Sequence, residues 1–206
     1  VWRYVPETLA PSARQGSVRP WEVLRIPELV SVYVVTVAFT FCMGTLAYGF
    51  PLLLVEQGYT TATAGQLLGW MALVAVLVML SVRQGQSLGR AVLGLGMIAG
   101  ALLGVWWGQG LWSYALLMGV YGSGFGLVFP AVHVLTFEQA PVQLRGSAYA
   151  LLYVAYSGGL IAGPLVAGAV SRALSPAVVA ATLSGAAIAG VAVWALRGRR
   201  TQCARL

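Results

Sequence analysis

The side chains that could do chemistry in this sequence are few, and three of them lie close together in the chain. His133 is the only histidine, and because an imidazole titrates near neutral pH, it could carry a proton. Glu138 and Arg145 could form an ion pair that breaks and re-forms as a gate moves. The plainer alternatives are a neutral histidine held by a hydrogen bond and an exposed ion pair worth less than about 1 kcal/mol.

Aromatic side chains form a second group of candidates. Tyr149, Tyr153 and Tyr156 are spaced i, i+4 and i+7, which places them on one face of a helix. In apolar surroundings a hydroxyl needs a partner, so this face should point into the protein. It would form either a wall that contacts a ligand or a helix contact in which the phenols bond to backbone. Four further candidates for a ligand pathway precede them in the chain: Thr45, Tyr48, Tyr121 and Phe125.

Several kinds of catalytic or metal site are excluded by composition. The 206 residues include no Lys, Asp or Asn, and Cys42 and Cys203 are far apart in the sequence. A zinc or iron–sulfur site needs clustered Cys and His, so we expect neither a metal nor a cofactor. A serine hydrolase needs a Ser–His pair, but Ser123 and His133 on one helix would be about 15 Å apart. We therefore expect no enzyme activity.

Six apolar segments must position these side chains. Hydrophobic residues make up 59% of the chain and charged residues 8%, against about 25% charged residues in a soluble domain. A helix of about 20 apolar residues crosses a bilayer, so the segments predict an all-α membrane protein. The predicted helices are 29–54, 63–82, 91–108, 111–137, 146–170 and 175–196.

The arginines predict the orientation of this bundle. Of the twelve, eleven lie in the N-terminal segment, in alternate loops or in the C-terminal tail, and only Arg172 lies on the other side. Positive charge collects on the cytoplasmic side, so both termini should be cytoplasmic, in a bacterial plasma membrane. We divide the chain into a cytoplasmic linker, 1–28, a six-helix bundle, 29–196, and a cytoplasmic tail, 197–206. The net charge of +7 then favours anionic lipid headgroups and not nucleic acid.

Small residues and prolines indicate how the helices pack and bend. Gly96, Gly100, Gly104 and Gly108 form a ladder on one predicted helix, which is typical of a close contact between membrane helices. Prolines inside helices, with glycines beside them, allow kinks, which could be hinges of a moving gate or static bends. The candidate hinges are Pro51, Gly126, Pro130, Gly163 and Pro164.

A weak internal repeat concerns the same prolines. The pairs Phe50-Pro51 and Glu56-Gln57 recur as Phe129-Pro130 and Glu138-Gln139, three helices later. Because three is an odd number, the two triplets would have opposite topologies, as in the inverted repeats of secondary transporters. The alternative is a chance recurrence in an apolar chain.

Longer motifs resemble a known family. The stretch 122–126, Gly-Ser-Gly-Phe-Gly, together with Pro130 and Arg145-Gly146, resembles the tenth and eleventh helices of the major facilitator superfamily. Residues 3–8, Arg-Tyr-Val-Pro-Glu-Thr, resemble the segment that follows its sixth helix. One departure is the loop 81–90, where the family often has an Asp and this chain has none.

The resemblance implies the C-terminal half of a twelve-helix transporter, with its six helices arranged as a 3+3 inverted repeat. A small-molecule substrate would pass by alternating access between this half and a missing N-terminal half of six helices. The first and fourth helices, with parts of the second and fifth, would line the pathway. Because the interiors of the predicted helices carry no Asp, Glu, Lys or Arg, a proton carrier would sit in the N-terminal half. We expect proton-coupled efflux of small organic molecules; the alternatives are an uptake symporter of the same superfamily and a free-standing six-helix protein that dimerises.

Overall fold

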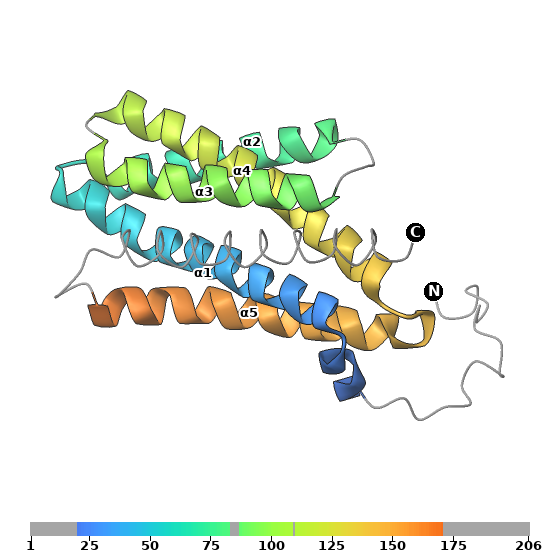
Figure 1. The fold of residues 1–206 in the computed structure, drawn as a ribbon. Helices are drawn as coiled ribbons and strands as arrows, with labels where there is room; N and C mark the ends of the chain where they lie inside the picture. The colour runs from blue at the N-terminus through green and yellow to red at the C-terminus, as the bar shows by residue number, and fades with distance from the viewer. Residues whose placement is uncertain (1–19, 83–86, 109, 171–206) are drawn as a thin grey trace, which may run out of the picture.

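Five long helices make up most of the computed structural model, which describes residues 20–82, 87–108 and 110–170 (Figure 1). All five are long and apolar enough to cross a membrane. The described part of the chain is therefore all-helical, as the sequence predicts, and the sixth predicted helix, 175–196, lies outside it. In chain order the elements are η2, Pro20–Arg25; α1, Pro27–Glu56; α2, Thr61–Ser81; α3, Ser87–Trp107; α4, Leu111–Gln139; η3, Val142–Leu144; and α5, Arg145–Val170.

The ends of the helices follow from local signals in the sequence. Pro27 opens α1, where a missing N–H costs no hydrogen bond, and Thr60 caps α2 by accepting a backbone N–H at 3.2 Å. Gly58 and Gly110 have positive φ angles of 86° and 89°, which allow the sharp turns after α1 and before α4. The predicted boundaries deviate most at the start of α3, because its first turn contains the polar residues Ser87 and Arg90.

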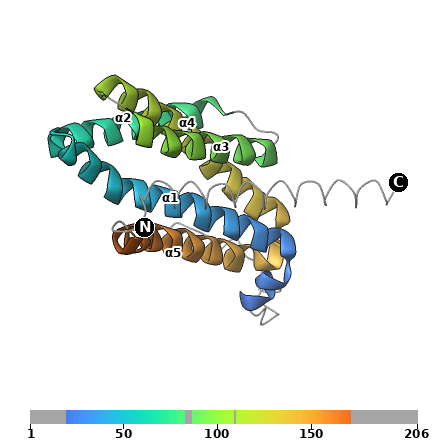
Figure 2. The ribbon, with the colours of Figure 1, turned by 60° about the vertical axis from the view of Figure 1, so that its left-hand side comes forward.

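The helices form two groups that α1 and α4 connect. α1 packs along α5, whereas α4 packs against both α2 and α3, and a smaller contact between α1 and α4 joins the groups. In Figure 1, α2 and α3 lie together above α1 and α5, and Figure 2 shows the same separation from another side. We call the end of the bundle with η2, η3 and the start of α5 the η3 end. The opposite end, with the α1–α2 and α3–α4 turns, is the Gly110 end.

Glycines allow the helix backbones to approach one another closely. A Cβ on Gly163 of α5 would lie 2.6 Å from the carbonyl oxygen of Phe41 and 2.7 Å from the backbone nitrogen of Thr45 on α1. A Cβ on Gly124 of α4 would lie 2.6 Å from the carbonyl oxygen of Gly94 on α3. The backbones thus approach so closely that only glycine fits, which is a common way for helices to associate in lipid.

The predicted glycine ladder on α3 meets α4 at two of its four positions. A Cβ on Gly104 or Gly108 would meet the side chain of Leu117 on α4, whereas no atom of the described residues lies within 4 Å of the Cβ position of Gly96 or Gly100. A packing role for these last two stays a prediction. Each four-residue step turns about 40° around an α-helix, so a ladder with this spacing rotates away from α4 toward the start of α3.

Tyr114 closes the Gly110 end. Its side chain is fully buried, and its ring packs edge-on against Phe50 with the centroids 5.8 Å apart. Its hydroxyl lies 2.8 Å from Oε1 of Gln57 and 2.9 Å from the carbonyl oxygen of Gly108. One side chain of α4 thus ties the α1–α2 turn to the α3–α4 turn.

Candidate functional site

Seven aromatic side chains from three helices contact one another toward the η3 end of the bundle. Phe125, Phe129 and His133 are four residues apart on α4 and so follow one stripe of that helix. Three tyrosines of α5 and one phenylalanine of α1 pack against this stripe. We call the group the aromatic wall: Phe39, Phe125, Phe129, His133, Tyr149, Tyr153 and Tyr156.

Ring contacts fix the geometry of the wall. The fully buried ring of Phe39 packs edge-on against Phe125 and Tyr156, with centroids 5.5 and 6.1 Å away. Phe125 stacks on Phe129 at 5.7 Å, and Phe129 lies 4.5 Å from His133. Each aromatic pair contributes about 0.5–1.5 kcal/mol beyond its buried area. The wall is therefore a preformed surface.

His133 is the polar centre of the wall. Its Nδ1 lies 2.8 Å from the carbonyl oxygen of Phe129, and because a carbonyl can only accept, Nδ1 must carry the hydrogen. In the neutral imidazole Nε2 is then an acceptor. The Tyr149 hydroxyl donates to the backbone carbonyl of His133 at 3.1 Å. The rings of Tyr149 and Tyr153 lie 6.2 and 6.0 Å from the imidazole, so aromatic neighbours from both α4 and α5 surround it.

The α5 side of the wall presents hydroxyl groups that are weakly bonded or exposed. The Tyr156 hydroxyl lies 3.9 Å from Sδ of Met43, and a thioether is a weak acceptor. Tyr153 is 55% exposed, so its ring and hydroxyl are accessible from outside the described helices. Together with Nε2 of His133, these groups give the wall a mixed aromatic and hydrogen-bonding surface.

Of the predicted pathway residues, the wall includes Phe125 and the three tyrosines of α5 and leaves out the other three. Tyr121 and Thr45 are buried, and their hydroxyl oxygens have no hydrogen-bond partner. Tyr48 is 42% exposed and lies near Gly168 of α5, toward the Gly110 end. The structure therefore does not place Thr45, Tyr48 and Tyr121 on the surface that the wall forms.

The predicted pair of Glu138 and Arg145 brackets the turn between α4 and α5. The guanidinium carbon of Arg145 lies 3.8 Å from the centroid of the Phe137 ring, which is a cation–π contact. Glu138 is exposed. Arg145 thus rests on an aromatic ring in this structure, and a pairing with Glu138 in another state stays a prediction.

The candidate hinges lie inside continuous helices. Pro51, Pro130 and Pro164 occur within α1, α4 and α5, where each removes a backbone hydrogen bond. Gly126 packs against α2, because a Cβ there would lie 2.7 Å from a carbonyl oxygen, and Gly163 packs against α1. These two glycines therefore have a packing role, and hinge motion at any of the five positions stays a prediction.

Two residues of the wall, Phe39 and Phe129, are not among the sequence-based candidates. Phe129 completes a four-residue spacing with Phe125 and His133, and that spacing could have identified it. Phe39 gives no such signal. Because α1 is apolar on nearly all sides, periodicity cannot show which of its faces meets α4 and α5.

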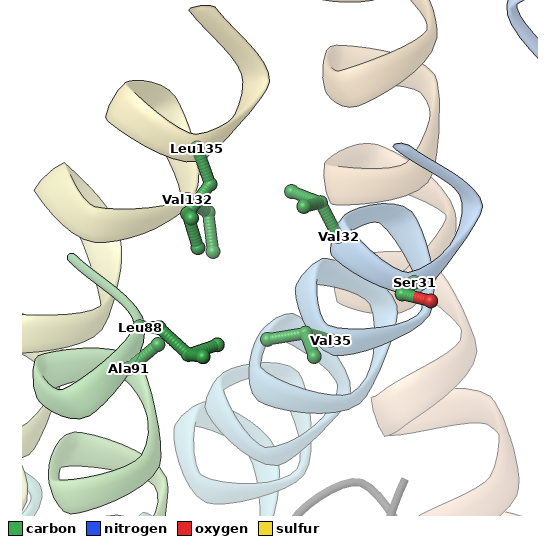
Figure 3. Close-up of a pocket in the computed structure, with 7 residues that line it drawn as sticks. All are labelled: Ser31, Val32, Val35, Leu88, Ala91, Val132 and Leu135. Atoms are coloured by element: carbon green, nitrogen blue, oxygen red, sulfur yellow. The ribbon is translucent and has the colours of Figure 1, made fainter. Parts of the chain in front are cut away.

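Two other possibilities, an apolar hollow and a metal centre, do not give a site in the described residues. The hollow lies between α1, α3 and α4 at the η3 end (Figure 3). Ser31 at its margin already donates to the carbonyl of Pro27 at 2.9 Å, so no polar group is left to orient a ligand. The described residues also include no cluster of three His, Cys, Asp or Glu side chains that could hold a metal. The remaining residues of the hollow are Val32, Val35, Leu88, Ala91, Val132 and Leu135.

Comparison with known families decides the class of protein. The family model described as Major Facilitator Superfamily matches residues 1–164. The chain belongs to the major facilitator superfamily. This superfamily consists of membrane transporters, so the chain is an integral membrane protein and its five apolar helices are membrane spans. A comparison with curated proteins gave no match. Within this major facilitator chain, the wall lies on α1, α4 and α5.

Proposed function

We propose that this major facilitator protein is a proton-coupled efflux carrier for small organic molecules and that the chain forms its C-terminal, six-helix half. Residues 175–196 would supply the sixth helix, and the bundle would be a 3+3 inverted repeat. Both termini would be cytoplasmic, in a bacterial inner membrane, which makes the η3 end the cytoplasmic end. Substrate would pass between this half and an N-terminal half by alternating access.

The observation that carries the proposal is the aromatic wall. Within the span of α4 and α5 it combines partly exposed rings with an oriented imidazole and accessible hydroxyl groups. A contact that served only to hold helices together would bury these groups, as α4 buries Tyr114 at the Gly110 end. A mainly aromatic surface with few polar atoms suits amphipathic molecules, whereas sugars and anions need several polar or cationic partners.

Proton coupling is assigned mainly to the N-terminal half. Glu28, Glu56 and Glu138 all lie at the ends of their helices, so the interiors of α1 to α5 contain no carboxylate. Away from the helix ends, His133 is the one histidine among the described residues, and an imidazole can carry a proton. A carboxylate that carries the proton would therefore belong to the other half, with His133 as the ionisable group on this side.

The turn between α4 and α5 is the proposed cytoplasmic gate. Arg145 rests on Phe137 in this structure, and Glu138 is the neighbouring carboxylate. We assign these contacts to two states, so that Arg145 leaves Phe137 for Glu138 when the cytoplasmic end changes its opening. Pro130 on α4 and Pro164 on α5 lie within the helices that would have to bend.

Everted membrane vesicles that contain the full-length protein test this proposal. With an acidic vesicle lumen, proton exit should drive fluorescent amphipathic dyes inward, and a protonophore should abolish their accumulation. Tyr156→Leu should slow accumulation strongly because it removes a ring of the wall. The control is Trp112→Leu, which removes an aromatic ring that is 85% exposed near the start of α4. Accumulation that ignores the proton gradient, or that falls equally in both variants, would contradict the proposal.

A further inference from the structure

We propose that the part of the aromatic wall around His133 binds the head of a protonated organic amine. Nε2 of the neutral imidazole would accept an N–H of the ammonium group, and the rings of Phe129, Tyr149 and Tyr153 would face its charge. The inference rests on the proposed transport function and deepens it, because it names the chemical class of the substrate. The inference follows from the orientation of the His133 imidazole and from the aromatic rings around it.

The acceptor is fixed by the helix itself. The hydrogen bond from Nδ1 to the carbonyl of Phe129, at 2.8 Å, uses the imidazole hydrogen and leaves the Nε2 lone pair for another partner. His133 lies six residues before the end of α4 at Gln139, or about 9 Å along the helix. At that depth an acceptor without a partner is costly, and a ligand with an N–H donor can satisfy it.

Aromatic rings beside the acceptor favour a positive charge. The centroids of Phe129, Tyr153 and Tyr149 lie 4.5, 6.0 and 6.2 Å from the imidazole centroid. An ammonium group bonded to Nε2 would be close to the same rings, and cation–π attraction acts within about 6 Å of a ring centroid. The attraction is largest where water is excluded, as it is for half-buried rings within a membrane span.

The positive charge near the wall is already engaged by another aromatic ring. Arg145, the basic residue at the start of α5, has its guanidinium on Phe137 and is not one of the residues that contact His133. The hydroxyls of Tyr153 and Tyr156 can accept further N–H groups, since one is exposed and the other has only a sulfur partner. The wall thus provides acceptors and π faces, which is the complement of an aromatic ammonium ion.

Nε2 can accept an N–H only in the neutral imidazole, because both ring nitrogens of a protonated imidazole are donors. The titratable groups that face the imidazole are the phenols of Tyr149 and Tyr153 on α5. α2 carries no ionisable side chain, and the one basic residue of α3 is Arg90. α1 meets the wall through Phe39, and its ionisable residues are Glu28, Tyr33, Cys42, Tyr48 and Glu56.

Three probes with one aromatic body and different charges test the inference. Phenylbutylammonium, phenylbutanol and phenylbutanoate would be titrated calorimetrically into the purified full-length protein in lipid nanodiscs. We expect the ammonium probe to bind roughly tenfold or more tightly than the alcohol, and the carboxylate to bind weakest.

Variants separate the acceptor from the rings. His133→Gln keeps a hydrogen-bond acceptor, so it should still bind the ammonium probe, whereas His133→Leu should lose most of the binding. Tyr153→Leu removes one ring beside His133, and because Tyr153 is 55% exposed, the buried contacts of the wall remain. Trp112→Leu is the aromatic control outside the wall.

Several outcomes would overturn the inference. These are equal binding of the alcohol and the ammonium probe, tighter binding of the carboxylate, no binding of the ammonium probe, or the same affinity in His133→Leu, Tyr153→Leu and the unchanged protein. Proton-driven dye accumulation in vesicles, together with any of these results, would leave the transport proposal intact and remove only the amine site. Loss of proton-driven transport alongside selective amine binding would contradict the transport proposal and leave the amine site intact.

Discussion

The two ends of α4 both carry aromatic side chains with polar atoms, but they treat those atoms in opposite ways. At the Gly110 end, Tyr114 is fully buried and its hydroxyl is bonded to two turns of the chain. Toward the η3 end, His133 is half-buried, its Nδ1 hydrogen is used within the helix, and its aromatic neighbour Tyr153 is exposed. One end uses its polar atoms to hold the protein together, and the other presents them to a surface.

This contrast shows how a structural aromatic residue can be told from a functional candidate in a membrane protein. Both kinds lie on apolar helices, and both pack against other rings. The difference lies in whether the polar atom already has a hydrogen-bond partner within the protein, since a polar atom without a partner is costly inside a membrane. Tyr121 lies between these cases, because it is fully buried and yet its hydroxyl has no partner.

The largest loss of stability is expected where the middle of α4 meets α3, because this contact holds both ends of α4 in place. Gly124→Leu would drive a side chain into the carbonyl oxygen of Gly94, 2.6 Å from the Cβ position. Overpacking of this kind costs about 1–3 kcal/mol or more, so we expect the protein to lose its monodisperse peak in size-exclusion chromatography in detergent. The control is Gly119→Leu, where the nearest atom is the indole nitrogen of Trp70 at 3.5 Å. Two equally monodisperse variants would show that the helices are not in close contact there.

The next largest change in stability should distinguish two buried tyrosines of α4, Tyr114 and Tyr121. Tyr114→Phe leaves the acceptors on Gln57 and Gly108 without their donor, which should cost about 1–3 kcal/mol of stability. Tyr121→Phe removes a hydroxyl that has no partner, so it should leave stability unchanged or raise it. Thermal unfolding followed by the intrinsic fluorescence of tryptophan and tyrosine side chains measures both. If Tyr121→Phe is as damaging as Tyr114→Phe, the Tyr121 hydroxyl has a bonded partner in the native protein.

The smallest effect is expected at the turn beyond the wall. Phe137→Leu removes the ring beneath Arg145, and because Phe137 is 49% exposed, the loss should be about 0.5–1 kcal/mol. Phe137→Tyr keeps the ring and serves as the control. A double-mutant cycle with Arg145→Gln, read by thermal unfolding, measures the coupling, and a coupling of zero would mean that the contact adds no stability.

Sequence alone predicts the five described helices because apolar runs and turn residues are local signals. Pro27, Gly58 and Gly110 each mark a helix end or a turn through their own backbone preferences. Which faces meet is a different matter, because a helix that is apolar on all sides has no periodic pattern that identifies its buried face. The glycines show this directly, since Gly94 contacts α4 closely while Gly96, two residues later, does not.

The candidate site is predictable only in part for the same reason. Tyr149, Tyr153 and Tyr156 form a face that sequence spacing identifies, and the structure brings all three to the wall. Tyr114 and Phe125 also share a stripe of α4 in the sequence, yet one closes the Gly110 end and the other joins the wall. Their different roles depend on Gln57, Gly108 and Phe39, which are distant in the chain, and no local pattern records those partners.

The pairing of α1 with α5 also sets the order in which the protein is assembled during synthesis. Tyr33 of α1 donates to the carbonyl of Ala148 on α5 at 3.0 Å, across 115 residues of chain. At about 5–20 residues per second a ribosome needs roughly 6–23 s to add that length. Until then α1 must persist without its main neighbour, and the hydroxyls of Thr36 and Thr40 are already bonded to carbonyls of their own helix at 2.8 Å. The first span can therefore enter the bilayer with these two hydroxyls already bonded, while the phenol of Tyr33 finds its acceptor only when the last described helix emerges.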